Sequence, residues 1–340
     1  MLLPFWAPLR IRMEHMIASH LTPVFEKISN SDEKIAELQY AKNIHSHELN
    51  VLRSEIHAAR HMIYAPDPSL QASNDDAPFM EHSNCQASDF FHPRYIQLCK
   101  LIDQRPRLHR KQWEFIYVLH KLLCSKVLQP EARGLVFGVG REPLPAVFAA
   151  MNIYITATDA PLDLTVTTDW SNSDQHSSSV TGLLHPNIVP DDKLRKYVTY
   201  DFCDMNAIDD KFNNYDFNWS SCCFEHLGSL EAGIQFVINA VEKTLKIGGV
   251  AVHTTEYNIS SNVDTVETGG TVIFRRKDID ELVCRLRERG HQVDEFTVGP
   301  TAHALDFHVD VPPYSGDVHL KLQLASYVTT SVGLTIRRGR

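Results

Sequence analysis

The stretch Gly134-Leu-Val-Phe-Gly-Val-Gly-Arg-Glu142 decides the fold of this chain. Its first four residues form a short apolar run typical of a buried strand, and a turn with two glycines, Gly138 and Gly140, follows directly. Glycine lets the backbone adopt unusual dihedral angles and approach a ligand closely. The stretch therefore predicts the first strand of an α/β sheet, with a ligand-binding turn at the carboxyl end of that strand.

Strand and helix patterns alternate after this turn. Further β-rich segments are residues 153–158, 197–200, 215–219 and 249–254. Segments with helical spacing lie between and after them, at residues 143–151, 230–245 and 277–289. Such alternation predicts a mainly parallel sheet with helices on both faces, and the tail, residues 322–336, suits a terminal hairpin partner of that sheet.

The beginning of the chain follows a different pattern. Between Leu21 and Ile63 the apolar residues recur on one heptad stripe, and the absence of Pro and Gly from residues 24–63 predicts a long helix. Three polar residues interrupt the stripe: Ser31, Lys42 and His45. Two interpretations stay open, a coiled-coil arm that makes a homo-oligomer through residues 21–63, or a helix that packs on its own domain.

The composition gives the domain boundaries. Residues 65–94 are rich in Pro, Ser, Asn and Asp, which predicts a linker or a loosely ordered loop. We therefore expect a helical arm at residues 1–64, a linker at residues 65–94, and an α/β domain at residues 95–340 that begins with one or two helices.

Charge and cysteine content narrow the class of protein. The chain has 340 residues and a formal net charge of −9, which gives no electrostatic footprint for DNA or RNA. No apolar run is long enough to span a bilayer, and no basic segment precedes an apolar one at the N-terminus, so we expect a cytoplasmic protein. The seven cysteines form no CxxC pair, which indicates free thiols in a reducing compartment.

Carboxylates follow the second and third strands. Asp159 comes about twenty residues after Gly138, where a carboxylate can accept hydrogen bonds from two ribose hydroxyls. Asp204 follows the third strand, where it could accept the amino group of an adenine ring with Met205 against that ring. The alternative is a tight turn with a capping aspartate and no ligand.

The residues after the glycines separate two cofactor classes. A dinucleotide fingerprint requires a third glycine and free backbone N–H groups for the pyrophosphate, but Pro143 stands there and removes one. S-adenosylmethionine has no phosphate and carries positive charge, so Glu142 suits it. An NAD-dependent oxidoreductase is therefore the less favoured alternative.

Five segments in this order carry a resemblance to a known family: Phe137–Pro145, Ala157–Asp159, Asp204–Asn206, Trp219–Gly228 and Leu245–His253. They resemble the class I S-adenosylmethionine-dependent methyltransferases, most closely a bacterial group associated with surface-polysaccharide biosynthesis. The resemblance covers residues from about 92 to the C-terminus and leaves out the heptad arm. It implies a Rossmann-like, doubly wound sheet of seven strands whose last strand is reversed.

The resemblance also implies cofactor contacts by matched position. These are Gly138, Gly140, Asp159, Asp204 and Met205, together with Ser220 and Ser221 at the end of the fourth strand. The chain departs from the family pattern at Phe137, where these enzymes commonly place an acidic residue. Glu142 is our candidate partner for the ammonium group of the cofactor.

The acceptor side requires a base if the methyl group goes to a hydroxyl. Glu225 and His226 follow the fourth strand, where the acceptor meets the methyl group in this fold, and His226 is our candidate base. Its alternative role is to orient the loop. Candidate substrate contacts are His176, His253, Glu256 and Tyr257.

Two polar segments could add walls to the acceptor site. His176 lies in residues 170–179, which form either a lid or a surface loop, and residues 306–314 with His319 form either a wall or a connecting loop. The candidate histidines and Glu256 show no spacing typical of metal ligands, so no metal site is predicted.

These patterns predict an S-adenosylmethionine-dependent methyltransferase that O-methylates a sugar or a related small molecule. The alternative in another class is a methyltransferase-like binding module with degraded catalysis, which scaffolds partners through the heptad arm. This alternative stays open because Phe137 stands where these enzymes commonly have an acidic residue.

Overall fold

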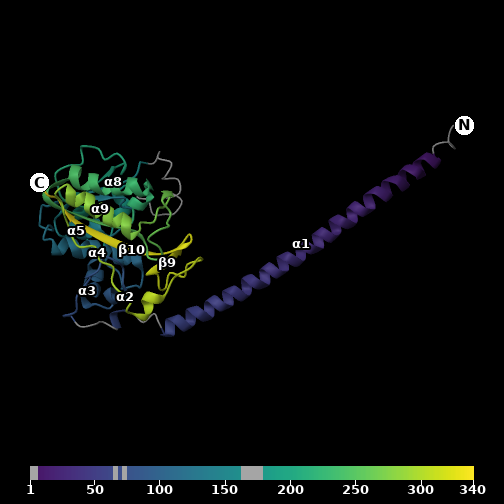
Figure 1. The fold of residues 1–340 in the computed structure, drawn as a ribbon, viewed down its shortest axis with the longest axis horizontal. Coiled ribbons are helices and arrows are strands. Elements are labelled where there is room, and N and C mark those ends of the chain that lie inside the picture. Colours follow the sequence, from purple (N-terminus) through teal and green to yellow (C-terminus); the bar gives the residue numbers. More distant parts are fainter. Residues whose placement is uncertain (1–6, 64–67, 71–74, 162–178) are drawn as a thin grey trace. The chain divides into compact units, whose positions relative to one another are not determined.

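The structure is a computed structural model that describes residues 7–63, 68–70, 75–161 and 179–340. It divides into two compact units, Met1–Tyr64 and Ala65–Arg340. In the first unit, the 57 residues of α1 (Ala7–Ile63) form one continuous helix, drawn in purple in Figure 1. The predicted long helix is thus present, and it starts earlier than expected because it continues through Pro23.

A central sheet organises the second unit. Its main strands are β1 (Arg133–Phe137), β2 (Tyr154–Asp159), β3 (Val198–Phe202), β4 (Tyr215–Ser221), β6 (Leu245–Asn258), β8 (Gln292–Val293) and β10 (Tyr327–Arg337). They lie in the order β3-β2-β1-β4-β6-β10-β8, and β9 (Lys321–Leu324) pairs with the end of β10. A separate two-stranded sheet joins β5 (Gly228–Ser229) and β7 (Thr268–Gly269).

The direction of the strands identifies the fold. The pairs from β3 through β6 are all parallel, whereas β10 runs antiparallel to both β6 and β8. The chain order reverses between β1 and β4, as in doubly wound sheets, and ligands bind such sheets at the carboxyl ends of the strands beside this reversal. The expected Rossmann-like sheet of seven strands with a reversed last strand is therefore confirmed.

Helices cover both faces of the sheet. One face carries α3 (Pro93–Leu101), α4 (Arg110–Cys124), α5 (Leu144–Ala150) and α7 (Asp191–Tyr197), and the other carries α8 (Leu230–Asn239) and α9 (Arg276–Glu288). Alternate residues of each strand enter the two cores: Val136 lies in the first, and Leu135 and Phe137 lie in the second. Ser229 begins α8 because its Oγ accepts a hydrogen bond of 3.1 Å from Ala232 N.

The second half of the predicted linker belongs to the α/β unit instead. Met80, Cys85 and Phe90 are fully buried, and α2 (Ala87–Phe90) continues into the helices of the domain. Cys85 N donates to Ser331 O at 2.9 Å, so this segment is hydrogen-bonded to β10. The sequence predicted a linker here because most residues of the segment are polar. Only a few apolar side chains anchor it in the core, and the polar residues around them form hydrogen bonds.

Two strands depart most from the prediction. β6 begins at Leu245, which pairs with Tyr215 of β4, and it ends at Asn258 because its pairing with β10 continues beyond the residues that pair with β4. The two-residue strand β8 has too short a pattern to be recognised in the sequence.

Among the described residues, no helix combines the length and apolar character that crossing a membrane requires.

Candidate active site

A cavity of about 570 Å³ opens at the carboxyl ends of β1 and β4. One of its walls is the turn Gly138–Glu142, and residues 221–226 after β4 lie beside that turn. Further walls come from the N-terminal part of α4, from Glu256 on β6, and from the C-terminal segment that contains Tyr314, His319 and Leu322. The cavity thus lies at the reversal of strand order, where the fold places ligands.

The glycine turn combines unusual backbone dihedral angles with a close approach to the loop after β4. Gly138 has a φ of 61° and Gly140 a φ of 50°, which favours glycine at both positions. A Cβ atom on Gly138 would lie 2.6 Å from Cys223 Sγ, so the turn approaches the β4 loop too closely for a side chain. Gly140 N donates to Asp159 Oδ2 at 3.2 Å, which places the predicted ribose-binding carboxylate beside the turn.

Four of the predicted cofactor residues are not part of the cavity lining: Asp159, which lies beside the turn, and Asp204, Met205 and Ser220. Asp204 Oδ1 accepts a hydrogen bond of 2.8 Å from Asn206 N, and Met205 packs against the second core. Ser220 Oγ is hydrogen-bonded to His253 Nδ1 at 2.8 Å inside the protein. Of the two predicted serines, Ser221 lines the cavity.

Glu142 is a buried carboxylate on the cavity wall. Its Oε1 accepts a hydrogen bond of 2.5 Å from Trp219 Nε1. Burial raises the pKa of Glu142 to about 7, although the hydrogen bond from Trp219 acts in the opposite direction. Phe137 packs in the other core, with its ring 5.0 Å from that of Phe236, so Glu142 is the acidic group that this turn presents.

Glu225 and His226 lie together on the short 3-10 helix η3 (Phe224–His226). Glu225 Oε2 accepts a hydrogen bond of 3.1 Å from Thr255 Oγ1, and Oε1 lies 4.0 Å from His226 Nε2. Burial raises the pKa of Glu225 to about 7 and lowers the pKa of His226. His226 Nδ1 lies 2.9 Å from Gly270 O. Because a carbonyl oxygen only accepts, Nδ1 carries the hydrogen and Nε2 is the basic atom of the neutral ring.

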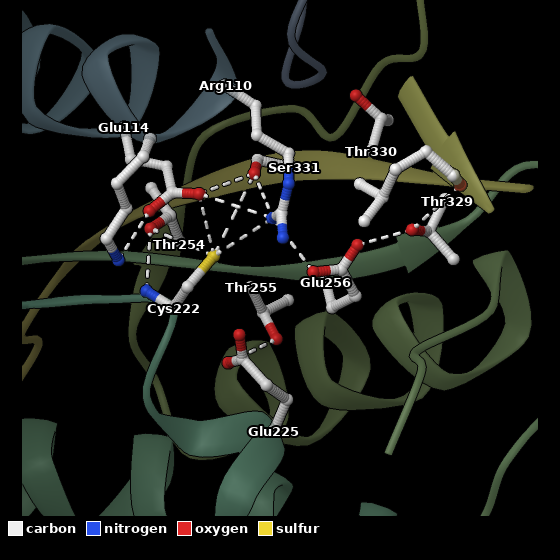
Figure 2. Close-up of polar contacts among 12 residues, drawn as sticks. Arg110, Glu114, Cys222, Glu225, Thr254, Thr255, Glu256, Thr329, Thr330 and Ser331 are labelled. Atoms are coloured by element: carbon white, nitrogen blue, oxygen red, sulfur yellow. Dashed lines mark hydrogen bonds and ion pairs between the residues drawn. The ribbon is translucent and has the colours of Figure 1, made fainter. Parts of the chain in front are cut away.

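A partly buried polar cluster lines the same cavity as Glu225, and Figure 2 shows three of its members, Arg110, Glu114 and Glu256. We call Arg110, Lys111, Glu114 and Glu256 the α4 ion cluster, since its first three members lie on α4. Arg110 Nη1 lies 2.8 Å from Glu256 Oε2, and Lys111 Nζ lies 3.0 Å from Glu114 Oε2. Burial alone would raise the pKa of Glu114, but Lys111 and Arg110 outweigh it and hold this pKa below its ordinary value.

Neighbouring strands complete the α4 ion cluster. Ser331 Oγ on β10 donates to Glu114 Oε1 at 2.6 Å, and Cys222 Sγ donates to the same atom at 3.0 Å. Thr329 Oγ1 donates to Glu256 Oε1 at 2.5 Å. The α4 members are not recognisable as site residues in the sequence, because Arg110 and Glu114 have the i,i+4 spacing of an ordinary surface ion pair. The signal that could have found them is that Glu114 lies between Trp113 and Tyr117 on the apolar side of α4.

The C-terminal segment whose role the sequence left open lines the cavity through Tyr314 and His319. His319 Nδ1 lies 2.8 Å from Asp310 Oδ2, and the His109 ring stacks on that of His319 at 4.6 Å. Burial acts to raise the pKa of Asp310, but the hydrogen bond from His319 and two backbone N–H groups outweigh it and lower the pKa. Asp310 therefore stays ionised and orients His319.

The predicted substrate contacts separate on the two faces of β6. Glu256 lines the cavity, whereas His253 is fully buried near Phe236 of α8, where burial lowers its pKa to about 3. Tyr257 packs in the same core as α8, so neither residue takes part in this site. Successive strand residues face opposite sides, which explains the separation.

His176 lies outside the described residues. Within the described ranges, no group of three or more His, Cys, Asp or Glu residues is arranged to hold a metal ion.

Comparisons with known proteins give partial structural overlaps. No family model matches the chain, and no curated protein matches it. Among solved structures, a Burkholderia thailandensis 1,6-didemethyltoxoflavin-N1-methyltransferase is 16% identical with a TM-score of 0.37, over 66% of this chain and 76% of that one. A Haemonchus contortus phosphoethanolamine N-methyltransferase 2 is 12% identical with a TM-score of 0.42, over 72% and 57%. A Clostridium acetobutylicum S-adenosylmethionine-dependent methyltransferase is 10% identical with a TM-score of 0.38, over 68% and 92%.

Proposed function

We propose that this protein is an S-adenosylmethionine-dependent methyltransferase that transfers a methyl group to a hydroxyl of a sugar or a related small molecule. One observation carries the proposal: a single cavity is lined both by the glycine turn Gly138–Glu142 and by Glu225 and His226. A methyl donor on the turn and an acceptor beside η3 would therefore share one enclosed space. A role in surface-polysaccharide assembly extends this proposal on the family resemblance alone.

The residues at the turn fit a cofactor without phosphate. α5 starts with Pro143 at its N-cap and Pro145 in its first turn, so this helix start lacks N–H groups that a pyrophosphate would need. The turn itself offers backbone atoms and the carboxylate of Glu142, which suits the ammonium group of S-adenosylmethionine. Asp159 beside Gly140 suits the ribose hydroxyls.

The acceptor chemistry follows from His226. When bound, S-adenosylmethionine supplies an electrophilic methyl group on a sulfonium. With the cofactor held at the glycine turn, His226 Nε2 would accept the proton of an acceptor hydroxyl placed beside η3. Glu225 Oε1 lies 4.0 Å from that nitrogen, close enough to stabilise the positive charge that the ring acquires.

The balance of charge in the cavity favours an uncharged acceptor. Arg110 and Lys111 are already paired with Glu256 and Glu114, so they offer little net attraction to an anion. A cationic acceptor would lie close to both of these cations. Hydroxyl groups, in contrast, can donate to Glu225 and His226, and the ring of Tyr314 offers a surface for the apolar face of a sugar.

Calorimetric titration of the full chain with S-adenosylhomocysteine tests the cofactor, with NAD as the control. We expect S-adenosylhomocysteine to bind and NAD not to bind, and we expect Asp159→Ala to weaken the binding by about 10- to 100-fold. Failure of S-adenosylhomocysteine to bind at millimolar concentration would overturn the proposal. Binding of NAD alone would favour an oxidoreductase.

A panel of acceptors tests the substrate class. Release of S-adenosylhomocysteine is followed with neutral sugars, sugar phosphates and amines as methyl acceptors. Turnover with neutral sugars supports the hydroxyl assignment, and turnover with amines alone would refute it. Cofactor binding without turnover on any hydroxyl acceptor would favour a binding module.

A further inference from the structure

The helix α1 carries an apolar stripe that no other described residue of its own unit covers. Its described side chains are those of residues 15–24, 27–28 and 30–53. The apolar residues at heptad positions a and d each have between 46% and 65% of their surface exposed: Leu21, Val24, Ile28, Ile35, Leu38, Leu49 and Leu52. Monomeric proteins rarely expose a continuous stripe of large apolar side chains, so this stripe indicates an interaction surface.

The repeat of the stripe specifies the kind of partner. The apolar residues recur every 3.5 residues, whereas a straight α-helix has 3.6 residues per turn. A strict seven-residue repeat stays on one line only when helices supercoil around each other with a left-handed twist. The partner is therefore another long helix with the same repeat, and α1 at 57 residues is the one such helix in the described parts of the chain.

We propose that α1 pairs in parallel and in register with α1 of a second copy of this chain. The charges flanking the stripe are self-complementary. In a parallel pair, Lys27 at position g lies opposite Asp32 at position e of the second copy, and Glu48 lies opposite Arg53. The two-fold symmetry doubles each of these attractive pairs.

The flanking charges alone fit both parallel and antiparallel pairing. The choice depends on which a and d residues of the two helices face each other, and each such facing pair forms one layer of the interface. In a parallel, in-register pair, Ser31, Lys42 and His45 each meet their own copy, and every apolar layer stays apolar. An antiparallel pair with overlapping stripes instead sets these polar residues against apolar ones. Lys at an a position is known to fix the register and the number of strands at some cost in stability.

Sedimentation equilibrium of the full chain tests the association, with a mass of 38.6 kDa for one copy. We expect the wild type to have twice this mass, and we expect the double variant Ile35→Lys and Leu38→Lys to raise the dissociation constant at least about 100-fold. The matched control is Tyr40→Lys, which removes an apolar residue that is 69% exposed but lies at position f, off the stripe.

The outcomes separate the possible partners of the stripe. An unchanged dissociation constant in the double variant, or an equal loss in Tyr40→Lys, would refute the stripe as the interface. A wild-type chain that is monomeric at all concentrations would also refute the proposal. If the double variant then lowered the melting temperature of the monomer, α1 would be packing on its own α/β unit.

Disulfide cross-linking tests the orientation. In a parallel, in-register pair, two copies of a Ser31→Cys variant face each other, so mild oxidation should convert most of the protein to a covalent dimer. The control Glu33→Cys places the thiol at position f, and both variants keep the exposed native Cys124 and Cys284. A dimer that forms no more cross-link in Ser31→Cys than in the control would rule out the parallel pair.

Discussion

The two sides of the cavity are built in different ways. The side formed by Gly138–Glu142 is one local turn, shaped by backbone dihedral angles and a close approach to Cys223. The other side consists of charged side chains from α4 and β6 with hydroxyl groups from β10, and these meet only in the folded protein. The turn is sensitive to added volume, whereas the α4 ion cluster is sensitive to lost charge.

The largest expected effect concerns the base, which lies between the two sides. The change His226→Gln should lower turnover with a hydroxyl acceptor by about 100- to 10,000-fold, because the amide cannot take up the proton. Affinity for S-adenosylhomocysteine should stay within about twofold, as measured by calorimetry. Equal turnover in the variant would mean that another group of the cavity lining, such as Glu225 or His319, accepts the proton.

The next effect concerns the charge in the α4 ion cluster. The change Glu114→Gln removes a buried charge that pairs with Lys111, whose side chain is 41% exposed and keeps its hydrogen bond to Ser221 O, so the free energy of unfolding should fall by about 1.5 to 3 kcal/mol in chemical denaturation. The control Asp280→Asn breaks an exposed pair with Arg276 and should cost about 0.5 kcal/mol. Similar losses in the two variants would show that the cluster is not electrostatically buried.

A smaller effect tests the sensitivity of the turn to volume. The change Gly138→Ala adds a methyl group that would lie 2.6 Å from Cys223 Sγ at a positive φ, so affinity for S-adenosylhomocysteine should fall about tenfold or more. Gly248→Ala has a similar φ of 81° but open space around it, and serves as the control. Calorimetry should show a loss of affinity in Gly138→Ala alone, and a loss in both would contradict the role of close approach.

The smallest effect is a difference in pH dependence between the two sides. Because burial raises the pKa of Glu142 from 4.5 to about 7, the folded state holds a proton that the unfolded state releases. The stability from this group is complete below pH 4.5 and is lost as the pH rises through 7. Glu142→Gln should therefore flatten the decline of unfolding free energy between pH 5 and 7 by about 1 kcal/mol per pH unit.

Glu114 on the other side should show the opposite sign. Its pKa lies below the ordinary value, so it contributes stability above pH 4.5 and loses it as the pH falls further. Denaturant unfolding at a series of pH values measures both slopes. If the two variants changed the profile in the same direction, the electrostatic contrast between the two sides would be wrong.

This contrast also explains what the sequence could and could not reveal. The turn at Gly138, the carboxylate of Asp159 and the pair Glu225–His226 follow strand ends, so local patterns predicted that they are near one another. The α4 ion cluster depends on Ser331, which is 217 residues from Glu114, and no local pattern links them. Long-range pairing of this kind appears only when the sheet is complete.

Other differences had a signal that was present but weak. His253 and Glu256 differ by an odd number of positions on one strand, so alternation alone would have placed them on opposite faces. The segment before α3 looked like a linker because its polar residues outnumber anchors such as Met80 and Phe90. The strand alternation and the apolar anchors are thus both present in the sequence, but the polar residues around them make each signal weak.

The pairing of Ser83, Asn84 and Cys85 with β10 has a consequence for biosynthesis. Ser83 O accepts a hydrogen bond of 2.7 Å from Gly333 N, and Asn84 forms a β-bridge with Val332. Residues that are synthesised early therefore form these pairs only with residues about 250 positions later in the chain. A ribosome produces β6 and the early segment first, and both wait with unpaired strand edges until β10 has been synthesised. During that interval Glu114 also lacks Ser331, so the nascent domain is most exposed to aggregation just before its last interior strand enters the sheet.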